Sequence, residues 1–337
     1  MRLTERLTEI KTHVLKGFDA PALMPGQWDK LLKESETKAV FLTPHWQRIW
    51  WESFGRGKLI LLGVEREGEW VVLAPLFADE GMIFFVGSGN SDYLDFIGDT
   101  SDPEILTAVL DQARALVPDF LGFKFYHVPD ESGTGARLQI AAERLGLICY
   151  DEGELSAPYL DLCAHPEAGR DAANRTSLLR HERFFERQGK LEIHHFKESE
   201  AILPHLEKFF TQHVSRWQGT PYPSLFLDSK ERHFYESLAQ NASEAEWLRF
   251  CRIDWDGQPI AFHFGFYYAG SFLWYKPSFD IALAKRSPGE VLLRQLLLAA
   301  IKEGARTFDF GLGDEVFKHR FANQTRRVRT WGVYPKP

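Results

Sequence analysis

The chain has 337 residues, of which 44% are hydrophobic and 26% are charged, and its formal net charge is −7. This composition is that of a globular protein long enough for two domains, and it excludes a disordered or fibrous chain. The acidic balance argues against general nucleic-acid binding, which calls for a basic domain. The N-terminus has no apolar signal region, and the most apolar stretch, residues 291–301, is too short to span a bilayer. We therefore expect a cytoplasmic protein, with peripheral membrane association left open.

Three cysteines, Cys149, Cys163 and Cys251, are widely spaced and form no paired motif. An odd number of such residues is typical of reduced thiols in a reducing compartment. We expect no disulfide and no metal site.

In the first half, an aromatic helix precedes two strands joined at Glu67-Gly68, a third strand, a helix and a return strand. The second half repeats this order, with turns at Asp256-Gly257 and Ala269-Gly270. The predicted elements are His45–Trp51, Lys58–Glu65, Val71–Phe77, Met82–Gly87, Ile105–Leu116 and Gly122–Tyr126, and then Phe209–Trp217, Trp247–Asp254, Pro259–Tyr268, Ser271–Lys276, Val291–Glu303 and Thr307–Phe310.

This repeat predicts an α/β (α+β) fold of two tandem domains, each a mixed, mostly antiparallel sheet flanked by helices. Breaks between Leu155 and Glu167 place the boundary there, giving domains 1–160 and 161–337. Residues 170–188 are predicted to form a linking helix that packs against, or bridges, both domains. Its arginines lie on one face, either as a solvated surface or as an anion-binding patch: Arg180, Arg183 and Arg187.

A series of short motifs runs through both halves: Trp50–Gly55, Ala74–Leu76, Ser91–Phe96, Gln212–Trp217, Ile260–Phe262, Phe279-Asp280, Ser287–Gly289, Phe308–Gly311 and Asp314–Lys318. Their order and spacing, over roughly residues 40–330, resemble the CelD-type acetyltransferases, GNAT-superfamily proteins encoded with cellulose and exopolysaccharide biosynthesis genes. The resemblance implies a tandem GNAT fold like that of the FemAB peptidyltransferases. It also implies an acyl donor, acyl-CoA or acetyl-CoA, bound to one half, but it does not identify the acceptor. The chain has Phe317-Lys318 where Tyr-Lys is expected.

A pyrophosphate-binding site is predicted where Ser287 and Gly289 open the apolar helix, because a helix N-terminus attracts anions. Lys285 and Arg286 lie just upstream, and Glu290 completes the predicted donor-binding set. The alternative is an ordinary helix start with Ser287 as its N-cap.

Three residues are candidates for the base that acyl transfer to an amine requires: Glu315, Asp309 and His213. The acids follow the apolar helix, near the predicted donor site. Alternatively, Asp309 is a structural carboxylate that caps a helix or pairs with Arg320, and Glu315 pairs with Lys318. A near-neutral pKa would suit His213 for this role, with His263 next in order, although a core or surface position is the commoner one for a histidine.

Acceptor contacts are predicted from two places. Asp92, Tyr93 and Asp95 follow a Gly-rich loop and are candidates to hold a hydroxyl or amine, or else to form turns. The second half contributes further substrate-binding candidates: Arg216, Trp217, Tyr275 and Lys318.

These features predict an acyl-CoA-dependent N-acyltransferase, or O-acyltransferase, acting on a cytoplasmic small-molecule, glycan or lipid precursor of a surface polysaccharide or lipid. One alternative is a FemAB-like transferase that uses aminoacyl-tRNA, with residues 170–190 contacting phosphates. Outside that alternative we expect no nucleic-acid partner. The other alternative is a non-catalytic scaffold protein of an exopolysaccharide complex. The missing hydroxyl at Phe317 is the reason to consider it.

Overall fold

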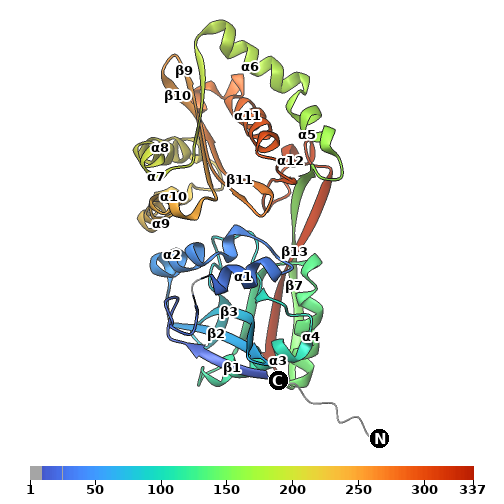
Figure 1. The fold of residues 1–337 in the computed structure, drawn as a ribbon. Helices are drawn as coiled ribbons and strands as arrows, with labels where there is room; N and C mark the ends of the chain where they lie inside the picture. The colour runs from blue at the N-terminus through green and yellow to red at the C-terminus, as the bar shows by residue number, and fades with distance from the viewer. Residues whose placement is uncertain (1–9, 25) are drawn as a thin grey trace, which may run out of the picture. The chain divides into compact units, whose positions relative to one another are not determined.

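The computed structural model of the protein describes residues 10–24 and 26–337. The first nine residues, part of the N-terminal segment in which no export signal is predicted, lie outside the described residues. The chain forms two compact units (Figure 1): unit 1 consists of Met1–Leu155 and Arg326–Pro337, and unit 2 of Ser156–Thr325. The predicted division, into residues 1–160 and 161–337, differs from these units in one main respect. The C-terminal residues belong to unit 1, because strand β13 (Gln324–Pro335) pairs antiparallel with β6 (Gly122–Pro129).

Unit 1 contains a mixed sheet with the strand order β1-β2-β3-β4-β6-β13-β7, and β5 pairs with β3. Strands β4 and β6 are parallel, whereas the β1–β2, β2–β3, β3–β4 and β6–β13 pairs are antiparallel. The remaining strands are β1 (Ile10–Leu15), β2 (Lys58–Arg66), β3 (Glu69–Asp79), β4 (Met82–Phe85), β5 (Ile97–Gly98) and β7 (Leu147–Asp161), and the helices are α1 (Gln27–Glu34), η1 (Val40–Leu42), α2 (Pro44–Phe54), α3 (Pro103–Ala115), η2 (Asp130–Ser132) and α4 (Thr134–Arg144).

Unit 2 contains the strand order β7-β12-β11-β10-β9-β8, in which the last part of β7 forms one edge. Only β11 and β12 pair in parallel in this part of the sheet. Its strands are β8 (Leu191–Phe196), β9 (Leu248–Trp255), β10 (Gln258–Tyr268), β11 (Ser271–Phe279) and β12 (Thr307–Asp309), and its helices are α5 (Pro166–Ala173), α6 (Thr176–Gln188), α7 (Ser199–Ile202), η3 (Leu203–His205), α8 (Leu206–Trp217), η4 (Leu225–Leu227), α9 (Ser229–Gln240), α10 (Ala242–Ala245), η5 (Ile281–Arg286), α11 (Pro288–Lys302) and α12 (Val316–His319).

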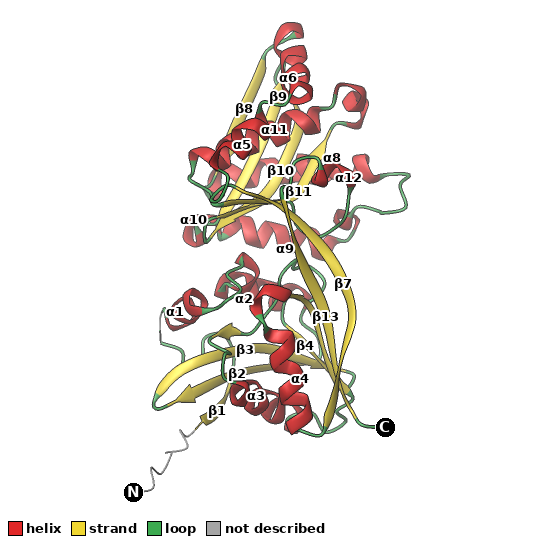
Figure 2. Ribbon diagram, turned by 90° about the vertical axis from the view of Figure 1, so that its right-hand side faces the viewer, coloured by secondary structure: helices red, strands yellow, loops and turns green. Residues whose placement is uncertain are grey.

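The two faces of the unit 2 sheet carry different helices (Figures 1 and 2). Helices α5, α6 and α11 share a hydrophobic core with strand residues such as Ile253 and Ala261. Alternate strand residues, such as Phe250 and Phe262, instead pack on Phe209 of α8. This division follows from the two-residue period of a strand, which sends successive side chains to opposite faces.

The prediction that residues 170–188 form one helix that packs against, or bridges, both domains is wrong. The segment forms two helices, α5 and α6, separated at Asn174-Arg175, and both belong to unit 2. The buried side chains of Leu178 and Phe185 pack with α11 in the core, so α6 presents Arg180, Arg183 and Arg187 to solvent on its outer face.

The repeat predicted from the sequence is confirmed by the order of the elements. In unit 1, β4–α3–β6 is a strand, a helix and a parallel strand, and β11–α11–β12 has the same arrangement in unit 2. Both helices begin with proline, Pro103 and Pro288, which needs no hydrogen-bond acceptor for its nitrogen. The fold class, a mixed and mostly antiparallel α/β arrangement, is therefore as expected. None of the helices within the described residues is long and apolar enough to cross a membrane.

Candidate functional site

Strands β11 and β12 separate soon after they begin to pair. Their parallel ladder includes only Ser271–Leu273 opposite Thr307–Asp309. Beyond Asp309 the chain continues along β7, its antiparallel partner, and the N–H of Phe310 donates to the carbonyl oxygen of Pro158 at 3.0 Å. The rest of β11 continues along β10 as its strand partner. A wedge therefore opens between β11 and the segment that follows β12.

A β-bulge lies where this wedge begins. Between the pairs Phe264–Lys276 and Phe266–Leu273, β11 has one residue more than β10. The fully buried ring of His263 enters this irregularity, and its Nε2 accepts the N–H of Tyr275 at 3.2 Å. Burial lowers the pKa of His263 to about 3, which keeps the ring neutral and able to accept that hydrogen bond. His263 therefore positions the backbone of β11, a role that its place after His213 among the histidine candidates did not predict.

Helix α11 begins at the far end of β11, after η5. Ser287 takes a left-handed conformation, with φ 56°, and its side chain makes no capping hydrogen bond. The structure thus does not support the alternative of an ordinary serine cap. The carbonyl oxygen of Ser287 accepts the N–H of Glu290 at 3.0 Å, and Pro288 has no N–H. In the first turn of α11, as far as the described residues show, the N–H of Gly289 therefore remains available to donate to a ligand. Gly289 packs on Phe279, whose Cδ1 would lie 3.0 Å from an added Cβ.

The charged residues around this helix start have different roles. Lys285 and Arg286 are exposed at the end of η5, and the guanidinium of Arg286 lies 4.4 Å from the ring centre of Phe184. Both are placed to attract an anion.

The contacts of Glu290, by contrast, contradict its predicted role in binding the donor. Its carboxylate lies 3.4 Å from Nε2 of His181 and 3.4 Å from the guanidinium of Arg320. A carboxylate in the first turn stabilises the helix but repels a phosphate. Glu290 therefore ties α11 to its neighbours.

The turn after β12 is held together by its own charged side chains. Asp309 is buried, and its Oδ1 accepts the N–H of Gly311 at 2.8 Å. Lys318 is also buried, with its Nζ 2.8 Å from a carboxylate oxygen of Glu315 and 2.6 Å from the carbonyl oxygen of Leu312. Lys318 is therefore a structural cation rather than the predicted substrate contact. The Glu315 side chain remains 57% exposed, so it can reach a substrate.

Helix α12 lies beside the wedge. The ring of Phe317 is 6.5 Å from that of Trp274 on β11 and 6.5 Å from that of Phe310 after β12. Glu315 immediately precedes this helix. Phe317 offers no hydroxyl there for proton transfer.

His213 occupies the other face of the sheet. Its side chain is buried among aromatic rings, and Nδ1 lies 2.8 Å from the hydroxyl oxygen of Ser224. Burial, together with the charges of Lys276 and Arg216, lowers the pKa of His213 to about 3. The near-neutral pKa expected of a base is therefore wrong for this residue, which the structure uses as a core histidine.

Arg216 and Trp217 end helix α8. The guanidinium of Arg216 lies 4.5 Å from the ring centre of Trp217 and 4.6 Å from that of Phe279. Burial lowers the pKa of Arg216. Tyr275 is buried on β11, with Nζ of Lys276 4.1 Å from its ring centre.

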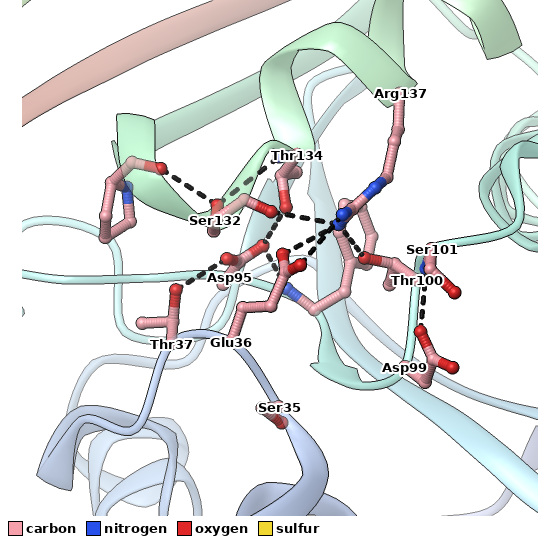
Figure 3. A network of polar contacts seen from close by, with 12 residues as sticks. Ser35, Glu36, Thr37, Asp95, Asp99, Thr100, Ser101, Ser132, Thr134 and Arg137 are labelled. Carbon is pink, nitrogen blue, oxygen red and sulfur yellow. Dashed lines mark hydrogen bonds and ion pairs between the residues drawn. The ribbon is translucent and has the colours of Figure 1, made fainter.

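Figure 3 shows why Asp95 is not the predicted acceptor contact. Its buried carboxylate accepts hydrogen bonds from the hydroxyls of Thr37 and Thr134, each at 2.7 Å, and from the N–H of Phe96 at 2.9 Å. Burial raises the pKa of Asp95, while these hydrogen bonds act in the opposite direction. The neighbouring Arg137 pairs with Glu36 rather than with a ligand. Asp95 thus joins separate segments of unit 1.

The other two residues of that loop also lie in unit 1. Tyr93 is buried, and the guanidinium of Arg326 lies 5.1 Å from its ring centre. Asp92 is half-buried. Over residues 10–24 and 26–337, no group of three or more His, Cys, Asp or Glu side chains is arranged to hold a metal ion.

Comparison with protein families identifies the domain that contains the wedge. Residues 172–319 match the acetyltransferase (GNAT) domain family, and this match lies within unit 2. The C-terminal part of the chain is thus similar to the acetyltransferase (GNAT) domain family, and this similarity supports an acyltransferase. No curated protein sequence gives a significant match.

Solved structures with low sequence identity share the fold of the whole chain. The structure of FemX has a TM-score of 0.66 at 12% identity, covering 91% of this chain and 95% of that one. A tandem GNAT protein from the clavulanic acid biosynthesis pathway gives 0.54 at 11% identity, covering 98% and 99%. The C-terminal domain of a protein described as a lysylphosphatidylglycerol synthetase, from Agrobacterium fabrum, gives 0.56 at 14% identity, covering 91% and 90%. At these identities the likeness establishes a tandem GNAT fold.

Proposed function

We propose that unit 2 transfers an acyl group from acyl-CoA to an amine, or to a hydroxyl, of a cytoplasmic precursor of a surface polysaccharide or lipid. The observation that supports this most directly is the separation of β11 from β12, together with the start of α11 after the far end of β11. It places an open strand edge, a helix N-terminus and an exposed carboxylate in one unit. The GNAT domain match over residues 172–319 supports the same reaction class.

The donor would lie in the wedge. An extended chain with amide groups, such as the pantetheine arm of CoA, can hydrogen-bond to the open edge of β11 as an added strand would. The pyrophosphate would then meet the N–H of Gly289 at the start of α11, with Lys285 and Arg286 adding positive charge. This assignment keeps three of the five predicted donor contacts, Lys285, Arg286 and Gly289; it gives Ser287 no contact of its own and excludes Glu290.

Glu315 is the proposed general base. In the reaction the acceptor nitrogen forms a bond to the thioester carbon, its surplus proton passes to the Glu315 carboxylate, and the carbon–sulfur bond then breaks to release the CoA thiolate. Backbone N–H groups at the edge of β11 can stabilise the oxyanion that forms in between. Because Phe317 lacks a hydroxyl, the leaving thiolate takes its proton from solvent.

The direct test measures free thiol released from acetyl-CoA and longer acyl-CoAs in the presence of a panel of amines. We expect acceptor-dependent thiol release by the full chain. Calorimetry with CoA is the companion measurement. Absence of CoA binding at high micromolar concentration would contradict the proposal and favour the scaffold alternative.

Aminoacyl transfer is the second candidate, favoured by the structural likeness to FemX and to the protein described as a lysylphosphatidylglycerol synthetase. The net charge of −7 argues against a large tRNA footprint, because neutralised phosphates supply most of such binding. Turnover of charged tRNA without thiol release from acyl-CoA would select this candidate.

A further inference from the structure

Arg216 has no counter-charge in unit 2. Its Nε and Nη1 atoms are buried and have no hydrogen-bond partner among the described residues. Burial alone lowers its pKa, and no carboxylate acts in the opposite direction. The residue as a whole is half-buried, so part of its side chain faces solvent.

Other half-buried arginines of the same unit are paired. The guanidinium of Arg249 lies 2.8 Å from the carboxylate of Glu303, and that of Arg294 lies 2.9 Å from that of Glu182. A buried charge without a partner is costly, and contact with aromatic rings offsets only part of that cost. The chain has 47 acidic residues, and the lack of a carboxylate beside Arg216 within its described part indicates a partner from outside the chain.

A second donor lies next to this guanidinium. The indole Nε1 of Trp217 is buried and, within the described part of the chain, has no acceptor. The side chain of Lys276 adds positive charge nearby, because Lys276 and Arg216 both lower the pKa of His213. Two unsatisfied donors in a positive field are a suitable arrangement for an oxyanion, and a guanidinium binds carboxylate or phosphate through two parallel hydrogen bonds.

The position of this pair distinguishes it from the donor site. Arg216 lies in the last turn of α8 and over Phe279, the last residue of β11. Gly289, at the start of α11, packs on the same ring. Helices α8 and α11 cover opposite faces of the sheet (Figure 1). The guanidinium therefore lies at the same end of β11 as the proposed pyrophosphate contact, but it is carried by the helix of the other face.

We propose that Arg216 and Trp217 bind an oxyanion, carboxylate or phosphate, of the acyl acceptor. The acceptor is then an anionic molecule that also carries the nucleophilic amine or hydroxyl. The assignment of this oxyanion to the acceptor rests on the proposed function. The oxyanion site itself rests on the unpaired donors of Arg216 and Trp217.

Inorganic phosphate is the probe for the first experiment, which uses the full chain labelled with ¹⁵N-tryptophan. The indole resonance of Trp217 is assigned by its loss in Trp217→Phe, and phosphate is added at constant ionic strength. We expect a saturable shift of this resonance with a dissociation constant in the range of about 1–10 mM. Arg216→Met should weaken binding at least about tenfold, because it removes the charge-assisted bonds.

Arg187→Met is the matched control, since Arg187 is an exposed arginine on α6 of the same unit. It should leave phosphate binding unchanged. Equal weakening by both variants would show a diffuse charge effect and overturn the proposal, as would the absence of a saturable shift up to about 50 mM phosphate.

A titration in saturating CoA separates the two sources of phosphate. Unchanged binding of inorganic phosphate supports an acceptor site, whereas competition by CoA would overturn it in favour of the donor. A transfer assay then compares phosphoethanolamine with ethanolamine, and Arg216→Met should remove a KM advantage of the former. If no acyl transfer occurs at all, the proposed function fails while the phosphate titration still decides whether the oxyanion site exists.

Discussion

Nε2 of His263 accepts the backbone N–H of Tyr275 at 3.2 Å, at the point where β11 has one residue more than β10. A side chain thus takes the place of a missing ladder carbonyl. This contact sets the course of β11 where it leaves β12, so the geometry of the wedge depends on a residue with no direct place in the chemistry.

Replacing His263 with phenylalanine should therefore separate positioning from binding. His263→Phe keeps a ring but leaves the Tyr275 N–H without its acceptor, at a cost of about 1–3 kcal/mol in the free energy of unfolding. We expect turnover to fall with the KM for acyl-CoA less affected, and His263→Gln to restore part of both losses. Denaturant unfolding and steady-state kinetics measure the two effects. Unchanged turnover in a folded His263→Phe variant would show that the bulge does not need this bond.

The two buried histidines predict how stability depends on pH. The pKa of both His213 and His263 is about 3 in the folded chain, below the ordinary value of 6.5. The unfolded chain therefore binds protons first, so their contribution is fully present above about pH 6.5 and is lost as pH falls toward 3. The slope should approach about 1.4 kcal/mol per pH unit for each histidine. Urea unfolding between pH 7 and pH 4 measures it, and a flat profile in that range would contradict the burial of both rings.

Glu315→Gln tests the proposed base. The amide keeps the size of the side chain but cannot accept the proton, so turnover should fall roughly 100- to 10,000-fold. CoA affinity should not change, because this carboxylate has no part in phosphate binding. Asp314→Asn, a neighbouring acid that pairs with His319, is the matched control and should retain activity.

Asp309→Asn completes this comparison. Its Oδ1 can still accept the Gly311 N–H, so we expect little loss of turnover. A large loss in Asp309→Asn together with an active Glu315→Gln would reassign the base to Asp309.

At the start of α11, Gly289→Asp and Gly289→Ala should differ in CoA binding. Any Cβ at this position meets Phe279, so both variants carry the same steric cost. Only the aspartate adds a negative charge where the pyrophosphate is expected, and we predict about a tenfold or greater loss of CoA affinity for it alone. Calorimetry with CoA measures this difference. Equal affinities in the two variants would remove α11 from the donor site.

Arg216→Met should stabilise the empty protein. Methionine fills the space between the rings of Trp217 and Phe279 and removes a charge that has no partner, so the free energy of unfolding should rise by about 1 kcal/mol. Thermal unfolding without phosphate measures the change. A clear loss of stability would mean that the guanidinium contributes mainly to packing.

Local features of the fold were predictable because each depends on adjacent residues. The hairpin turns at Glu67-Gly68, Asp256-Gly257 and Ala269-Gly270 have positive φ at both positions, as short turns between twisted strands require. The prolines at 103 and 288 mark helix starts through their fixed φ. Repetition of these signals was sufficient to predict two similar halves.

The roles of charged and polar residues were decided only by the tertiary structure, because their partners lie far away in the chain. Asp95 is buried and bonded to Thr37 and Thr134, whereas its loop sequence alone predicted an exposed residue. Strand β13 joins unit 1 through a ladder to a strand some 200 residues earlier. Composition shows that 47 acids are available, but only packing shows that no acid within residues 10–24 and 26–337 pairs with Arg216. Burial, and with it the pKa and binding capacity of a side chain, is a property of the assembled core rather than of neighbouring residues.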